Sequence, residues 1–134
     1  MRIKALAAVL ISATLLLGGP TGMAVAHTFR DRTQLTLNVS DRNVDRGDYV
    51  VFSGRLKADH KECRAHRIVE LYRDGVKVDQ TQTNDDGEYR FRRRVFDDHR
   101  WQVRFGGFVG GTHPHSHTCK ESESKRVKVN VRHR

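Results

Sequence analysis

The chain has 134 residues and is strongly basic, with 25 Lys and Arg against 16 Asp and Glu and a formal net charge of +9 at pH 7. This length accommodates one ordinary domain and excludes a large multidomain protein. The positive excess favours anionic partners such as cell-wall polymers, acidic glycans, nucleic acid or lipid head groups, although it also keeps a small domain in solution.

Residues 1–26 have the pattern of a secretory signal peptide. A short basic start precedes an apolar run from Ala5 to Leu17, and Ala24-Val25-Ala26 provides a small-x-small cleavage site. The alternative is an uncleaved membrane anchor, but the apolar run is shorter than the roughly 20 residues that a spanning helix needs. We therefore expect a secreted, extracellular protein that associates with the cell wall or is released.

Cleavage leaves one expected domain over residues 27–134, with its core at about 33–131. Removal of Arg2 and Lys4 lowers the basic residues from 25 to 23 against 16 acidic ones, so the mature net charge is +7. The polar segments 27–32 and 132–134 are expected to fray. No large interface is evident in the sequence, and a monomer is expected.

The mature segment repeats apolar residues with a period of two, which is typical of strands with one buried and one solvated face. Arg93 interrupts the apolar side of one such run, and no window shows helical periodicity. Seven short strands therefore predict an all-β, antiparallel, immunoglobulin-like β-sandwich. They lie at about 35–39, 50–56, 69–71, 76–78, 89–95, 101–105 and 127–131.

Turn residues separate these runs. Asp74-Gly75 predicts a tight hairpin because glycine tolerates positive φ. Asn84-Asp85-Asp86-Gly87 predicts a second turn, and the glycines between 106 and 111 open what we expect to be a long loop.

Two cysteines lie in loops of the predicted sandwich. Cys63 follows the second predicted strand, and Cys119 precedes the last one. In an immunoglobulin-like strand order these loops emerge at the same end, so in an oxidising compartment a disulfide is expected. Closing a loop of this length is worth about 4 kcal/mol on the chain-entropy model. The alternative is a pair of thiolate metal ligands.

Five histidines lie near the cysteines in sequence and would gather at one end of the sandwich if the disulfide forms: His60, His66, His113, His115 and His117. Imidazole is a good ligand for Cu²⁺ and Zn²⁺, so metal binding is an alternative function. The spacing matches no tight metal motif, and a flexible or pH-responsive polar loop explains it equally. Cleavage after Ala26 would make His27 the N-terminal residue, which can also chelate copper.

Basic residues occupy the polar side of three predicted strands. Four of them are predicted to form an anion-binding face if the last two strands are neighbours, namely Arg100, Arg104, Arg126 and Lys128. Arg90, Arg92 and Arg94 share one side of another strand. Such faces bind polyanions through salt-sensitive contacts, or simply discourage edge pairing. No exposed aromatic residues are spaced for base stacking, so nucleic acid is not favoured.

The sequence contains no catalytic motif. It lacks a Gly-x-Ser-x-Gly elbow, a phosphate-cradling glycine loop and a His-Glu-x-x-His pair. We therefore expect a non-enzymatic protein without a required cofactor, with copper or zinc as the ligand in the metal-binding alternative.

Three motifs carry a resemblance. Gly47 to Leu56 reads G-x-x-V-x-F-S-G-x-L, and it is followed by Val69-Glu70-Leu71 and by Asp86-Gly87-Glu88-Tyr89-Arg90-Phe91. This succession resembles the immunoglobulin-like or transthyretin-like β-sandwich modules of secreted bacterial, especially actinobacterial, proteins. The resemblance covers about 33–131 and implies a spacer, adhesion or binding role.

The cysteine pair and the histidine-rich loop depart from the common pattern of those modules. The expected function is therefore an interaction module that contacts an anionic cell-wall polymer, a glycan or another surface protein.

Overall fold

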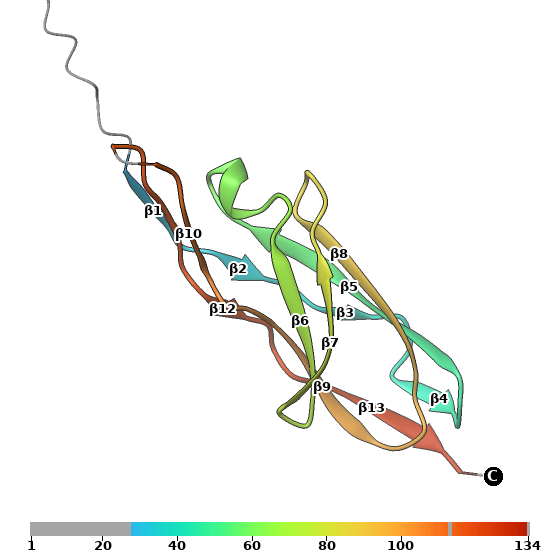
Figure 1. Cartoon of the computed structure of the whole chain (residues 1–134). Coiled ribbons are helices and arrows are strands. Elements are labelled where there is room, and N and C mark those ends of the chain that lie inside the picture. Colours follow the sequence, from blue (N-terminus) through green and yellow to red (C-terminus); the bar gives the residue numbers. More distant parts are fainter. Residues whose placement is uncertain (1–27, 113, 134) are drawn as a thin grey trace, which may run out of the picture.

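The computed structural model describes residues 28–112 and 114–133 (Figure 1). The predicted signal peptide 1–26, His27 and His113 lie outside these residues. The described chain is all β apart from one short 3₁₀ helix. In order, its elements are β1 (Phe29–Asp31), β2 (Gln34–Leu35), β3 (Asn38–Val39), β4 (Asn43–Asp45), β5 (Tyr49–Lys57), η1 (Lys61–Cys63), β6 (Ile68–Arg73), β7 (Val76–Gln82), β8 (Glu88–Arg94), β9 (His99–Phe105), β10 (Phe108–Gly110), β11 (His117–Cys119), β12 (Ser122–Glu123) and β13 (Val127–Arg132).

The main strands form two layers of a sandwich. One layer has β5 paired with β2, β3 and β8, and the other has the order β4-β13-β9-β6-β7, with β12 also paired to β9. A third, small sheet of β1-β11-β10 lies at the end of the molecule opposite the C-terminus (Figure 1). The expected all-β, sandwich-like fold is confirmed. Its pairs are antiparallel except for two short parallel ones, β1 with β11 and β4 with β13.

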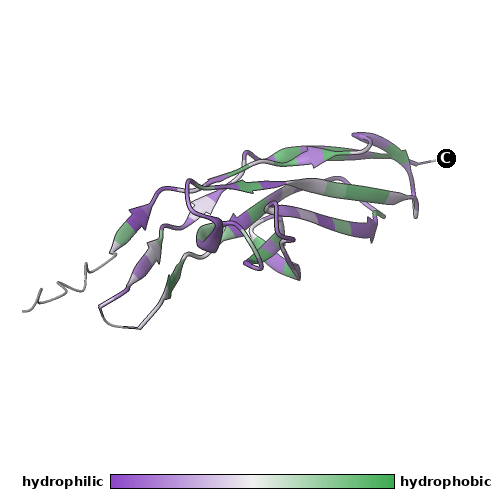
Figure 2. Ribbon diagram, turned by 90° about the horizontal axis from the view of Figure 1, so that it is seen from above, coloured by the Kyte–Doolittle hydropathy of each residue, from purple (hydrophilic) through white to green (hydrophobic). Residues whose placement is uncertain are grey.

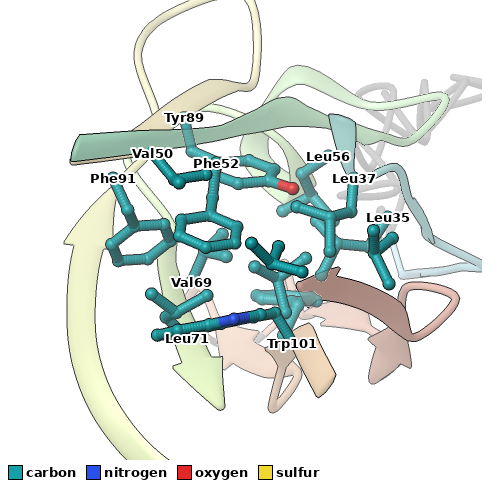
Figure 3. Packing of buried hydrophobic residues seen from close by; sticks show 14 of the residues in the cluster. Leu35, Leu37, Val50, Phe52, Leu56, Val69, Leu71, Tyr89, Phe91 and Trp101 are labelled. Carbon is teal, nitrogen blue, oxygen red and sulfur yellow. The ribbon is translucent and has the colours of Figure 1, made fainter. Parts of the chain in front are cut away.

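The core lies between the two layers and is built from the apolar side of each strand, as the period of two predicts. Figure 2 shows the alternation of polar and apolar residues along the strands. The rings of Phe52 from β5 and Trp101 from β9 have centroids 4.6 Å apart, and both side chains are fully enclosed (Figure 3). Tyr89 and Phe91 from β8 close the same cluster.

Arg93, on the apolar side of β8, is explained by its position at the edge of the sandwich. Its guanidinium reaches β7, where Nη1 donates to the Val78 carbonyl at 3.4 Å and lies 3.7 Å from Asp79 Oδ2. The aliphatic part of the side chain can line the core while the charge stays at the rim. This arginine therefore joins the edge strands of the two layers.

Both predicted tight turns are confirmed. The β6–β7 hairpin has positive φ at both Asp74 (49°) and Gly75 (82°), which suits the twist of a two-residue hairpin. Between β7 and β8, the Asn84 side-chain oxygen accepts the backbone N–H of Asp86 and of Glu88, and Gly87 has φ 82°. This second turn carries the chain from one layer to the other.

The expectation of a frayed segment at 27–32 is wrong for the part that the structure describes. Phe29–Asp31 forms β1 and pairs in parallel with His117–Cys119. The expected long loop after residue 106 likewise contains β10 and β11, an antiparallel pair. At the other end Arg132 lies in β13, and its Nε is 3.1 Å from Asp45 Oδ1. Long-range pairing, which local composition does not reveal, orders these ends.

Among the described residues, no helix is both long and apolar enough to cross a membrane.

Candidate functional site

The predicted disulfide between Cys63 and Cys119 is confirmed. The sulfur atoms are 2.00 Å apart, the Cα atoms are 5.3 Å apart, and both side chains are buried. Cys63 ends η1, which lies between β5 and β6, and Cys119 ends β11. The bond therefore fastens the small β1-β11-β10 sheet to the main sandwich.

His60 and His117 meet at one aromatic ring. The His60 ring stacks on Phe29 with centroids 3.6 Å apart, and the His117 ring meets Phe29 edge-on at 4.3 Å. Asp31, which is buried, accepts the His60 backbone N–H through Oδ2 and contacts Nδ1 through Oδ1, both at 2.7 Å. These contacts tie β1 to the loop before η1, so they have a structural role.

The other predicted histidine ligands are placed differently. His66 Nε2 lies 2.6 Å from Asp85 Oδ1 in the turn before β8, while His115 lies in the turn before β11, where its N–H bonds to the Thr112 carbonyl. Within residues 28–112 and 114–133, no group of three or more His, Cys, Asp or Glu side chains could hold a metal ion. The described members of the predicted ligand set, His60, His66, His115 and His117, thus lie near one end of the fold without forming a group that could hold a metal ion.

The predicted anion-binding face divides into two parts. Lys128 on β13 lies directly opposite Arg100 on β9, and Arg126 is exposed just before β13. Arg104 lies apart from them. It is opposite Glu123 of β12, with Nε 3.4 Å from the carboxylate, and its guanidinium covers the ring of Tyr72 at 4.3 Å.

Arg104 has a second acidic neighbour, because Glu70 of β6 is its partner on the other side. The Glu70 carboxylate is itself 3.1 Å from Lys77 Nζ, so Glu123 is the carboxylate that chiefly reduces the attraction of this arginine for an external anion. The sequence could not show this, since the acidic neighbours come from strands far away in the chain.

A more uniform basic surface lies on the outer face of β8. Arg90, Arg92 and Arg94 alternate with the buried Tyr89 and Phe91, so all three point to solvent. We call these three residues the arginine stripe. Each has a neutral residue opposite it on β5, namely Ser53, Val51 and Tyr49 in turn. Among the described residues, none of the three arginines has a carboxylate partner within ion-pair distance.

Tyr49 orders one end of the stripe. Its side chain is 46% exposed, and the guanidinium carbons of Arg92 and Arg94 lie 3.8 and 4.8 Å from the centre of its ring. Stacking on an aromatic ring leaves the N–H groups at the rim of a guanidinium free to donate. The pair therefore presents oriented donors on an exposed strand.

The acidic residue nearest the stripe in sequence, Glu88, is already engaged. Arg55 Nη2 lies 2.8 Å from Glu88 Oε1, and the hydrogen bond from Arg55, aided by Asn84, holds the pKa of Glu88 below its ordinary value. Glu88 is thus ionised and paired at neutral pH, and it offsets Arg55 rather than the stripe.

An open groove of about 1050 Å³ adjoins Arg90 on the same face. Hydroxyl and amide side chains dominate its wall, among them Thr36, Asn38, Ser53 and Gln82. Such groups exchange hydrogen bonds with polyhydroxylated ligands as readily as with water. The face thus combines a row of cations with a polar groove, whose charged lining residues are Arg55, Lys57, Glu88 and Arg90.

These features define an all-β, sandwich-like domain with one disulfide and a basic outer sheet face. Comparison with protein-family models and with curated proteins finds no match to this chain. The candidate site therefore rests on geometry and charge.

Proposed function

We propose that the protein is an exported, non-enzymatic interaction module that binds anionic polymers of the cell surface through the arginine stripe. The observation that supports this is the row of three exposed arginines, Arg90, Arg92 and Arg94, without a carboxylate partner among the described residues. Export rests on the signal-peptide pattern of residues 1–26.

Repulsion within the stripe supports a role in binding. The three guanidinium groups lie on one side of one strand, where like charges disfavour each other. A polyanion laid along β8 would relieve this repulsion and accept charge-assisted hydrogen bonds. A stripe kept only for solubility would do as well with lysine, whose strongly hydrated ammonium does not bind anions through two parallel hydrogen bonds.

The contact with Tyr49 separates the stripe from the face on β9 and β13. Arg100, Arg126 and Lys128 carry the same formal charge as the stripe and, among the described residues, likewise have no carboxylate partner within ion-pair distance. They differ in being spread over β9, β13 and the residue before β13, and within the described chain no aromatic ring lies beneath their charged groups. Arg104, which would extend them, is offset by Glu123. They are therefore the matched control for the stripe.

The test is titration of a fluorescent polyanion such as heparin at several salt concentrations. The variant R90Q/R92Q/R94Q and the control R100Q/R126Q/K128Q each remove three positive charges. If each stripe contact releases one counterion, the slope of log K against log salt should be less steep by about 2 to 3 in the stripe variant than in wild type. The slope of the control variant should change little. An equal loss of affinity in both variants would mean that net charge alone drives binding. An affinity that does not fall as salt is added would refute the proposal.

A further inference from the structure

We infer that the preferred ligand of the arginine stripe is an extended phosphodiester polymer with a hydroxylated, base-free linker and six covalent bonds between successive phosphorus atoms, as in 1,3-linked poly(glycerol phosphate). This inference rests on the proposed function and adds the ligand class. It is drawn from the spacing of Arg90, Arg92 and Arg94, from their contacts with Tyr49, and from the groove beside Arg90.

The spacing of the stripe is that of every second residue of a strand. An extended backbone advances 3.3–3.6 Å for each residue of three bonds, so two residues, or six bonds, span about 7 Å. The chain P–O–C–C–C–O–P also contains six bonds and repeats at about the same distance when extended. The backbone of a single-stranded nucleic acid has the same six-bond repeat, so the spacing selects a phosphodiester repeat and the surroundings of the stripe select the linker. A polymer lying parallel to β8 would place one phosphate at each arginine without a change of register.

The ordering of the guanidinium groups favours phosphate over an unspecific negative charge. Arg92 and Arg94 are held against the ring of Tyr49, at 3.8 and 4.8 Å from its centre. Planar guanidinium groups held in this way can each donate two parallel hydrogen bonds to one phosphate. Less side-chain entropy is lost on binding, because the two groups are already ordered.

The surroundings of the stripe favour a hydroxylated linker over nucleobases. Beyond Arg90 the groove offers the Asn38 and Gln82 amides and the Ser53 hydroxyl, which suit the free hydroxyl groups of a polyol or its sugar substituents. Tyr49, the aromatic residue at the stripe, already carries two arginines. A nucleobase would have to displace one of them before it could stack.

The experiment compares four polymers of equal charge number by calorimetry on the disulfide-bonded mature protein. They are 1,3-linked glycerol phosphate oligomers, 1,5-linked ribitol phosphate oligomers with eight bonds between phosphorus atoms, an oligogalacturonate and a single-stranded oligonucleotide. The eight-bond repeat advances about 9 Å, so it loses register with at least one arginine. We expect it to bind about fivefold more weakly, the loss of one exposed ion pair.

Two charge-preserving variants add a second readout. R92K keeps the charge but removes the flat guanidinium, and Y49F keeps the ring. We expect R92K to lose most of the preference for glycerol phosphate over ribitol phosphate, while Y49F retains it. Circular dichroism of each variant confirms that it is folded.

The outcomes are distinguishable. Tighter binding of the glycerol phosphate oligomer than of the other three supports the inference. Equal binding of all four overturns it while leaving the proposed function intact, and so does tighter binding of the oligonucleotide, which would indicate base stacking. Failure of all four to bind, or loss of binding only in R100Q/R126Q/K128Q, refutes the proposed function itself.

Discussion

Replacement of Gly54 by alanine should strongly destabilise the fold, because the space beside this residue is occupied by backbone. An alanine Cβ at position 54 would lie 2.1 Å from the Thr36 carbonyl oxygen and 2.7 Å from the Tyr89 hydroxyl oxygen. That hydroxyl donates to the same Thr36 carbonyl. The glycine in the motif of β5 is therefore explained by the close approach of the segment between β2 and β3.

The size of the stability loss in Gly54→Ala follows from the groups that must move to make room for the added Cβ. A carbon–oxygen contact needs about 3.3 Å, so the Thr36 carbonyl must retreat by more than 1 Å. This strains the hydrogen bond from Thr36 N to the Arg55 carbonyl, now 3.1 Å, and the one from Tyr89. Overpacking costs about 1–3 kcal/mol and two weakened hydrogen bonds about 1 kcal/mol each. Alanine also lowers the entropy of the unfolded chain, which stabilises the fold by about 0.5–1 kcal/mol. The free energy of unfolding should therefore fall by about 3 kcal/mol in total.

Urea unfolding followed by fluorescence measures this loss, since Trp101 is the single tryptophan of the chain and lies in the core. Gly75→Ala is the matched control: Gly75 has φ 82° but nothing within 4 Å of the added Cβ. Alanine at position 75 therefore meets no steric clash, and its cost is that of a left-handed backbone conformation, about 1–2 kcal/mol. If Gly54→Ala lowers the free energy of unfolding by less than Gly75→Ala does, the close approach of the Thr36 carbonyl to Gly54 is refuted.

Three further predictions concern stability. Cys63→Ala/Cys119→Ala should lower the free energy of unfolding by about 4 kcal/mol, given a separation of 56 residues; an unchanged urea midpoint would contradict this. Hydrogen bonds from the Arg100 backbone and from His99 lower the pKa of Asp74 below 3.8, so its stabilisation is present above that pH and lost as pH falls through the folded value. The difference in urea midpoint between wild type and Asp74→Asn should accordingly shrink between pH 6 and pH 2.5, and a constant difference would argue against it. Burial raises the pKa of Tyr89 well above 10, so wild type should lose stability as pH rises past 10, and Tyr89→Phe should lose less over the same range.

The strands and tight turns of the sandwich are predictable from sequence because they depend on local periodicity and on backbone preferences. Residues 50–56 and 89–95 alternate clearly, and Asp74-Gly75 is a strong hairpin signal. The disulfide was also predictable, because the predicted oxidising compartment and the predicted order of the strands both favoured it.

Register is what the sequence could not reveal. The alternation of Arg100, Arg104 and Lys128 was visible, but Lys128 pairs with Arg100, and β12 brings Glu123 to Arg104. A two-residue strand such as β12 leaves no periodic signal. The exposed arginines of β8 were equally visible, and their pairing with neutral residues of β5 and their contact with Tyr49 set them apart.

The small sheet was missed for a related reason. Its strands are three residues long and lie among glycines and histidines, so local composition indicates a loop. The packing of Phe29 against His60 and the bond between Cys63 and Cys119 order it, and both are long-range contacts.

The most direct test of the central claim is to map amide chemical shifts of the ¹⁵N-labelled protein during titration with a 1,3-linked glycerol phosphate oligomer. Binding along the arginine stripe predicts that the largest changes fall in β8 from Arg90 to Arg94 and in the facing part of β5 around Tyr49, and that they fade as salt is added. Changes centred on Arg100 and Lys128, or the absence of changes at low salt, would contradict it.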